Sequence, residues 1–168
     1  MNYAAATDDA NPLYLDDAGG RTVIAPPMFA VAATWPVSER IHAFLEGTDF
    51  PIGLLQTQVH YTEHLAFHRP LRPGDTLTIK GRIAAILPHR AGTVCVIRFD
   101  ACDRDGAAVF TEHIGAMSRG VQCIGEGRGA ADIPAMPSPP DASAPPRWET
   151  SVHIGRLQPF VYDGCTNI

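Results

Sequence analysis

The sequence contains no apolar run that approaches the length of a membrane span. Its 168 residues are 45% hydrophobic, but polar residues interrupt them well before the roughly 18 consecutive apolar positions that a transmembrane helix needs. The first residues, 1–4, also lack the basic and apolar regions of a secretory signal. We therefore expect a cytoplasmic protein that makes no contact with a membrane.

Basic residues are also few. The formal net charge is −5 and the isoelectric point is about 5.7. Nucleic-acid binding relies on a basic surface that neutralises phosphates, and this composition does not supply one. The sequence therefore argues against a nucleic-acid partner.

Cysteine is too sparse to build the protein around disulfides or zinc. The four cysteines show neither C-x-x-C pairs nor the Cys/His spacing of a zinc site. Three histidines, His60, His64 and His68, recur every four residues, but the residues between them alternate as in a strand. We expect all three on one strand face, about 13 Å apart. That separation is too long for shared coordination, so no metal is expected.

The apolar residues that are present predict one helical region near the N-terminus. A helix is expected to begin near Pro27, because proline suits a first helical turn. It should turn its apolar side inward and kink or end at Pro36. Helical spacing then continues to Gly47, a suitable C-cap. The expected inward residues are Met28, Phe29, Val31, Ala32 and Trp35.

Four long strands follow. The period of the apolar residues changes to two after Gly53, and turn sequences separate the strands. The Asp105-Gly106 pair is a strong hairpin signal. One helical region and four consecutive strands predict an α+β domain over residues 1–124, in which an antiparallel sheet wraps a helix. The expected strands cover residues 59–67, 76–87, 93–103 and 107–120.

The composition changes after this domain. Six of the 15 prolines lie between Pro134 and Pro146, which predicts an extended linker over residues 125–147, without helix or strand. Residues 148–168 become apolar and patterned again. They form either a C-terminal tail that packs back on the first domain or the start of a second unit.

Three segments carry a resemblance to a known family. The run Asp8-Asp9-Ala10-Asn11-Pro12-Leu13-Tyr14, the run 23–29 and the turn 68–77 together resemble the N-terminal half of MaoC-like dehydratases. The resemblance covers roughly residues 3–122 and implies a hot-dog fold. It also implies hydration of trans-2-enoyl thioesters, or the reverse dehydration of (R)-3-hydroxyacyl thioesters, without a cofactor. The expected partners are an acyl-CoA or acyl-carrier-protein thioester and a second hot-dog domain, in a homo- or hetero-oligomer.

The resemblance also marks site residues. Asp9, Asn11 and Tyr14 match catalytic-motif positions, and Pro27, Met28 and Phe29 match the substrate-binding start of the central helix. The family motif is Asp-x-Asn-Pro-x-His, in which Asp and His activate one water, while a His-Gly-Met sequence at the helix start offers an N–H to the thioester oxygen.

This chain departs from that pattern twice. Tyr14 stands in place of the histidine, and Pro27, which has no N–H, stands in place of the glycine. Residues 153–168 resemble the start of a second hot-dog repeat, but no Asp-x-Asn-Pro-x-His follows. The chain is thus expected to be one subunit of a split enzyme, or a fragment. We favour a helix-end role for Asp9 and a pocket-filling role for Tyr14.

Taken with these departures, the resemblance implies the substrate-binding half of an (R)-specific enoyl-CoA hydratase or 3-hydroxyacyl dehydratase, lacking the catalytic histidine. A non-catalytic acyl-thioester-binding module and a hot-dog thioesterase remain alternatives. Residues 25–35 contain no carboxylate, which weakens the thioesterase alternative. Arg69 and Arg72 are positioned to contact a coenzyme A phosphate or to belong to a solvated turn with Asp75.

Overall fold

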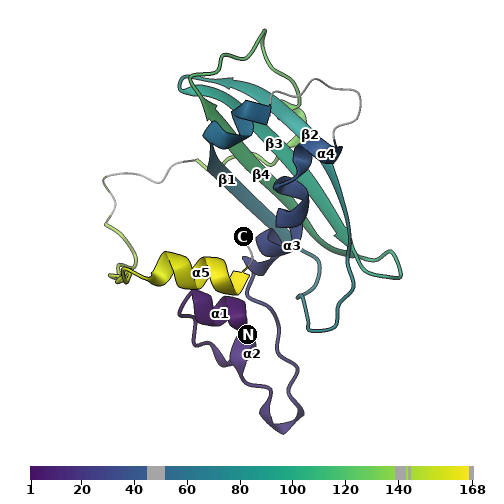
Figure 1. Cartoon of the computed structure of the whole chain (residues 1–168), viewed down its shortest axis with the longest axis vertical. Helices are drawn as coiled ribbons and strands as arrows, with labels where there is room; N and C mark the ends of the chain where they lie inside the picture. Colours follow the sequence, from purple (N-terminus) through teal and green to yellow (C-terminus); the bar gives the residue numbers. More distant parts are fainter. Residues whose placement is uncertain (45–51, 139–142, 144, 167–168) are drawn as a thin grey trace.

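A four-stranded antiparallel sheet forms the centre of the protein (Figure 1). The computed structural model describes residues 1–44, 52–138, 143 and 145–166. The strand order is β1-β4-β3-β2, and each boundary falls within a few residues of its predicted position. The strands are β1 (Gln58–Phe67), β2 (Thr78–His89), β3 (Gly92–Cys102) and β4 (Ala108–Arg119).

The β3–β4 hairpin forms as its turn sequence predicts. The Asp103 carboxylate accepts hydrogen bonds from the N–H groups of Asp105 and Ala107, at 3.1 and 2.9 Å. Gly106 adopts a φ of +81°, which a glycine accepts without steric cost. This turn fixes the register in which Phe99 lies opposite Glu112.

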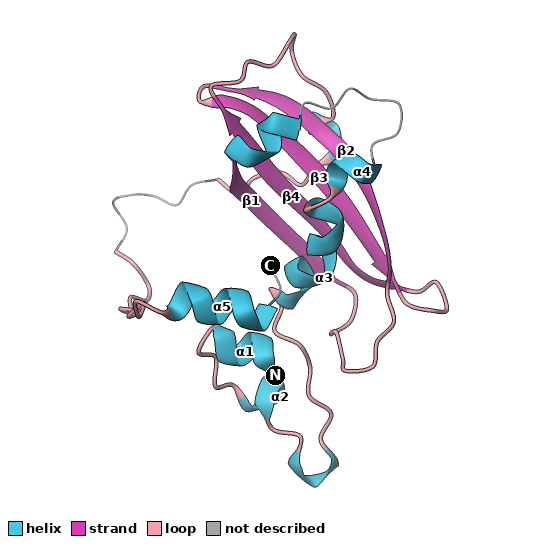
Figure 2. Ribbon diagram, viewed as in Figure 1, coloured by secondary structure: helices cyan, strands magenta, loops and turns pink. Residues whose placement is uncertain are grey.

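The two faces of the sheet differ in what covers them. We call the face carrying Phe110, Glu112 and Ile114 the helix face, because helix α3 (Phe29–Ser38) crosses it (Figure 2). The opposite face carries Thr111 and His113, and we call it the outer face. The predicted α+β arrangement of a helix against an antiparallel sheet is therefore confirmed.

A bulge in β1 corrects the expected placement of the histidines. His60 pairs with Ala116, whereas His64 pairs with His113, so the register shifts by one residue between them. Because one inserted residue turns the following side chains to the other face, His60 lies on the helix face and His64 on the outer face. His68 follows the end of the strand. The prediction that the three histidines share one face is wrong.

Helix α3 turns small residues toward the sheet. Ala30 and Thr34 are its buried residues, and Ala30 packs against Leu71 and Phe110. The predicted inward side was wrong: Met28 and Phe29 are exposed, and Val31, Ala32 and Trp35 are only half-buried. Small side chains let the helix backbone approach the sheet closely, which apolar periodicity alone does not reveal.

The helix continues for two residues beyond Pro36 and ends at Ser38. A short helix, α4 (Ile41–Phe44), follows. The predicted C-cap at Gly47 lies outside the described residues. A 3-10 helix, η2 (Ile52–Thr57), then leads into β1.

The first and the last of the described helices meet away from the sheet (Figure 1). Helix α1 (Asn2–Ala6) packs against α5 (Gln158–Thr166), and α2 (Pro12–Leu15) and η1 (Ala18–Gly20) follow α1. The hydroxyl groups of Tyr3 and Tyr162 are 3.3 Å apart, and the side-chain amide of Gln158 donates to the carbonyl oxygen of Ala6. The C-terminal segment thus returns to the N-terminal helices.

Part of the predicted linker is structured. The backbone of Arg128 exchanges two hydrogen bonds with Ile86 of β2, at 2.8 and 2.9 Å, and a 3-10 helix, η3 (Ala130–Asp132), follows. Ile133 then packs on the outer face. The expectation of a stretch without helix or strand is therefore wrong for residues 125–138, which we call the strap. The division of the chain at residues 124 and 147 stays a prediction.

In the part of the chain that the structure describes, no helix is long and apolar enough to cross a membrane. No group of three or more His, Cys, Asp or Glu side chains among these residues lies close enough together to hold a metal ion.

Candidate functional site

The segment matching the catalytic motif folds into two consecutive side-chain-capped turns. The Asp9 carboxylate accepts the N–H of Asn11 at 3.0 Å, and the Asn11 side-chain oxygen accepts the N–H of Leu13 at 3.0 Å. Asn11 thereby caps α2, with Pro12 in its first turn. Tyr14 lies in α2 and is half-buried. These hydrogen bonds give Asp9 and Asn11 a structural role, and their catalytic roles stay a prediction.

The start of α3 has its amides already engaged. The N–H groups of Phe29, Ala30 and Val31 donate to the carbonyl oxygens three residues earlier, at 2.9, 3.2 and 3.2 Å. Pro27 has no N–H to add. The first turn therefore offers a thioester oxygen fewer donors than a helix start with free amides.

Met28 and Phe29 present apolar surface at this helix start. Met28 is 45% exposed and Phe29 38% exposed. The Phe29 ring meets Tyr3 of α1 edge-on, with the ring centroids 5.7 Å apart. The substrate-binding residues of the prediction thus adjoin the N-terminal helices. Among the described residues, no hydrogen bond or ring contact joins Tyr14 to Met28 or Phe29.

The Arg69–Asp75 turn is held together internally. The Asp75 carboxylate accepts hydrogen bonds from the Arg69 guanidinium and from the N–H of Arg72, both at 2.8 Å. Arg69 also reaches Asp103 at 3.5 Å. The bond from Arg69 lowers the pKa of Asp75. The structure therefore supports a structural role for Arg69 rather than a phosphate contact.

The structure places two carboxyl groups, which the sequence analysis missed, under α3. Glu63 of β1 and Glu112 of β4 both face the helix, and Glu112 is fully buried. Among the described residues, neither carboxyl group makes a hydrogen bond of normal geometry. The nearby Thr34 hydroxyl donates to the carbonyl oxygen of Val31 instead, at 3.1 Å. The sequence does carry a signal for this pair. In the alternation of each strand, the glutamate stands at a position where an apolar residue is expected.

Burial controls the ionisation of this pair. It raises the pKa of Glu63 to about 8, with the Glu112 carboxyl adding to the shift. It raises the pKa of Glu112 to about 7, an effect that Thr34 and Glu63 partly offset. The His60 ring lies 3.3 Å from Glu63. Two buried carboxyl groups of this kind share protons near neutral pH. Their oxygens are closed to solvent, so they serve the fold rather than a diffusing substrate.

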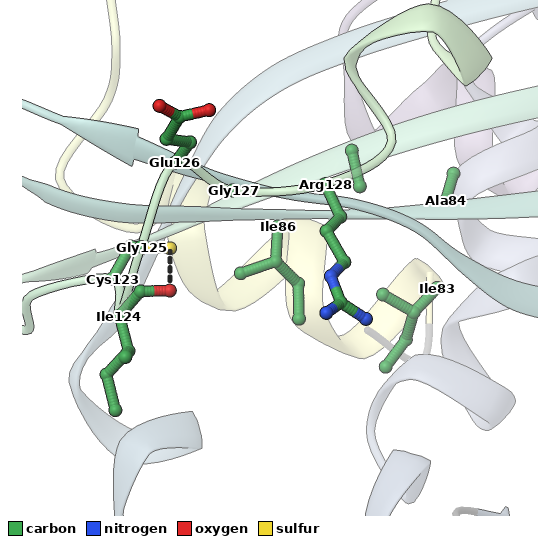
Figure 3. A pocket seen from close by; sticks show the side chains of 10 residues that line it. Ile83, Ala84, Ile86, Cys123, Ile124, Gly125, Glu126, Gly127 and Arg128 are labelled. Atoms are coloured by element: carbon green, nitrogen blue, oxygen red, sulfur yellow. Dashed lines mark hydrogen bonds between the residues drawn. The ribbon is translucent and has the colours of Figure 1, made fainter.

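A cavity of about 440 Å³ lies at the β2 edge, between the strand and residues 123–128, which include the start of the strap. Figure 3 shows Ile83, Ile86, Ile124 and Arg128 directed to one side of this edge and Glu126 to the other. Glu126 and Arg128 are both exposed. We assign this open cavity no chemistry.

Comparison with known proteins places these features in a family. The model of the family "FAS1-like, dehydratase domain region" matches residues 1–112. UPF0336 protein SCO4636 of Streptomyces coelicolor is 30% identical over 126 residues, covering 71% of this chain and 81% of the relative. A UPF0336 protein of Streptomyces avermitilis is 31% identical over 115 residues, covering 65% of this chain and 73% of the relative.

Solved structures identify the fold. A MaoC-like dehydratase from Phytophthora capsici is 19% identical, with a TM-score of 0.73. The match covers 99% of this chain and 56% of that chain, so this protein spans little more than half of it. The truncated HadBC (3R-hydroxyacyl-ACP dehydratase) complex of Mycobacterium tuberculosis is 18% identical, with a TM-score of 0.56, covering 68% of this chain and 81% of that one.

These matches confirm the predicted hot-dog fold of the MaoC-like type. The family model spans more than half of the chain, and the match to the Streptomyces coelicolor relative covers 81% of that protein. The chain therefore belongs to the FAS1-like dehydratase domain region family.

Proposed function

We propose that this chain is the substrate-binding half of an (R)-specific enoyl-thioester hydratase, or of a 3-hydroxyacyl-thioester dehydratase, which catalyses the reverse reaction. A second hot-dog domain carrying Asp-x-Asn-Pro-x-His supplies the general acid–base pair. One observation carries the proposal: the motif turn is intact at Asp9 and Asn11, whereas Tyr14 and Pro27 stand where a base and an oxyanion donor are needed. In general, a tyrosine hydroxyl is a much weaker base at neutral pH than a histidine ring.

The proposed partner packs edge to edge with this sheet and against the start of α3. Strand β1 lies at one edge of the sheet and, among the described residues, pairs only with β4. At the start of α3, the exposed Met28 and Phe29 provide apolar surface of the kind that interfaces bury. The HadBC structure is a complex, which supports association with a different hot-dog chain. Its description as a 3R-hydroxyacyl-ACP dehydratase supports a thioester substrate.

Hydration of crotonyl-CoA tests the proposal. The purified chain alone is expected to give no rate above the uncatalysed reaction, and activity should appear when a hot-dog chain carrying Asp-x-Asn-Pro-x-His is added. In that mixture, Asp9→Asn should lower the rate by less than about tenfold, because Asp9 holds a turn and the partner supplies the working carboxylate. Rapid hydration by the isolated chain, abolished by Asp9→Asn, would show that this repeat is itself catalytic.

Restoring the histidine alone is expected to fail. General-base catalysis and oxyanion stabilisation each raise the reaction rate by about 10²–10⁴-fold. Tyr14→His would restore a base, but the N–H donor that Pro27 lacks would still be missing. The single variant should stay inactive without a partner, as measured by loss of enoyl-thioester absorbance. Substantial hydratase activity of the Tyr14→His variant without a partner would contradict the interpretation that Pro27 removes a required oxyanion donor.

The same purified protein and crotonyl-CoA distinguish the two alternative functions, a thioesterase and a non-catalytic acyl-thioester-binding module. A thioesterase would release free coenzyme A, which a thiol reagent detects. A binding module would bind crotonyl-CoA without turning it over, even with a catalytic partner present. The buried Glu63 and Glu112 do not favour a thioesterase, because their oxygens are inaccessible.

A further inference from the structure

Strand β2 lies at the edge of the sheet opposite β1, and the strap covers part of that edge. Arg128 of the strap lies beside Ile86 (Figure 3), and the two residues exchange both backbone hydrogen bonds of an antiparallel pair, at 2.8 and 2.9 Å. Further along the strap, Ile133 packs against the apolar cluster around Val94 and Val96 on the outer face. The strap is therefore attached both to the edge of the sheet and to its face.

The contact between the strap and β2 requires a glycine at position 129. A Cβ atom there would overlap the carbonyl oxygen of Ala84 and lie 2.7 Å from Cα of Ala85, both in the backbone of β2. Gly129 also has a φ of +84°, which other residues adopt only with strain. Gly125 has nearly the same φ, +83°, but a Cβ atom there would meet nothing within 4 Å. The close approach is thus confined to the part of the strap that touches β2.

The strap covers the stretch of β2 that its own side chains leave unprotected. The edge of a sheet pairs readily with other chains, and native proteins oppose this with charged residues, proline or a covering segment. Lys80 and Arg82 protect the first half of β2, and Pro88 protects its end. Between them, Ile83 and Ile86 are 37% and 42% exposed and carry no charge. The strap reaches the edge at Ile86, within this apolar stretch.

The edge beneath the strap is complementary to itself. If the strap left, the N–H and the carbonyl oxygen of Ile86 that now bond to Arg128 would lose their partners. A second copy of β2, antiparallel to the first across a two-fold axis, supplies both, because Ile86 of each copy then exchanges the same two hydrogen bonds with Ile86 of the other. This pairing would also bury the exposed side chains of Ile83 and Ile86. The uncovered edge therefore fits a second copy of this chain.

We propose that the strap is an autoinhibitory edge cap, which occupies the place of a second β2 strand and prevents two copies of this chain from pairing through β2. The partner of the proposed function is assigned to the opposite edge of the sheet, at β1. The inference is therefore independent of the proposed thioester chemistry, because it concerns only the contacts of the strap with β2.

Light scattering coupled to size-exclusion chromatography of the full chain tests this proposal. Gly129→Ala should push the strap off β2 and raise the particle mass at least twofold over that of the wild type at the same protein concentration. Gly125→Ala is the matched control, because it introduces the same backbone strain without an atom against β2. It should keep the mass of the wild type.

Two further changes identify the edge that pairs. Arg128→Pro removes the N–H that donates to Ile86 without adding an atom against β2, so it should raise the mass as Gly129→Ala does. Adding Ile86→Lys to Gly129→Ala should restore the mass of the wild type, because it places two like charges opposite each other. Far-UV circular dichroism verifies that each variant is folded. The proposal is overturned if folded Gly129→Ala or Arg128→Pro keeps the mass of the wild type, if Gly125→Ala associates equally, or if Ile86→Lys does not reverse the association.

Discussion

Replacing Glu112 by glutamine is expected to raise the thermal midpoint at pH 8.5 and to leave it nearly unchanged at pH 5. The folded-state pKa values of Glu63 and Glu112, about 8 and about 7, lie above the ordinary value of 4.5. As pH rises, the unfolded chain therefore loses the protons of these two carboxyl groups at a lower pH than the folded protein does. The stability that the protonated pair provides is full below about pH 4.5 and is lost as pH rises toward 8.

The size of the effect follows from the Glu112 shift. Each pKa unit corresponds to about 1.4 kcal/mol, so the free energy of unfolding should fall by roughly 3 kcal/mol through Glu112 alone. For a chain of this length that is roughly 6–12 °C in thermal midpoint. Glu112→Gln removes the ionisation and should flatten the pH profile by this amount. Circular dichroism melts between pH 5 and 8.5 measure it.

The control is Glu149→Gln, which changes an exposed glutamate in the C-terminal segment. Its melting profile should run parallel to that of the wild type. If the melting profile of Glu112→Gln also runs parallel to that of the wild type across this pH range, Glu112 does not have the raised pKa of a buried carboxyl group and the description of the buried pair is wrong.

Enlarging Gly81 is expected to destabilise the protein strongly. Gly81 of β2 lies opposite Phe99 of β3, and Phe99 is fully buried. A Cβ atom at position 81 would lie 2.6 Å from Cε1 of the Phe99 ring. Since a buried ring has little room to move, Gly81→Val should cost on the order of 3 kcal/mol, at the upper end of the usual overpacking cost.

A double-mutant cycle distinguishes this packing from a general intolerance of β2. Phe99→Ala alone should cost about 3–5 kcal/mol by opening a cavity. Combined with Gly81→Val, it should cost less than the sum of the two single changes, because the valine enters the space that the ring vacates. Urea unfolding measures all three variants. Strict additivity would mean that the two positions do not contact each other.

The sheet and its hairpins were predictable because the information is local. Alternating apolar residues and the Asp105-Gly106 turn are read within a few positions of the chain. The motif turn was equally local: Asp9 and Asn11 bond to residues two positions away, as their preference for turns and helix ends predicts. The departures at Tyr14 and Pro27 were visible in the sequence for the same reason.

The sequence alone determined the number and nature of the strands, the helix near Pro27 and the turn that Asp9 and Asn11 form. Tertiary structure decided which sides of these elements are buried. The bulge separating His60 from His64, the meeting of Glu63 with Glu112 and the return of α5 to α1 all depend on residues far apart in sequence. Side-chain periodicity indicates only that one face of a strand is buried. A one-residue shift in strand pairing, or a strap that crosses the outer face, changes which residues lie together on the buried face. Only the folded chain determines which residues these are.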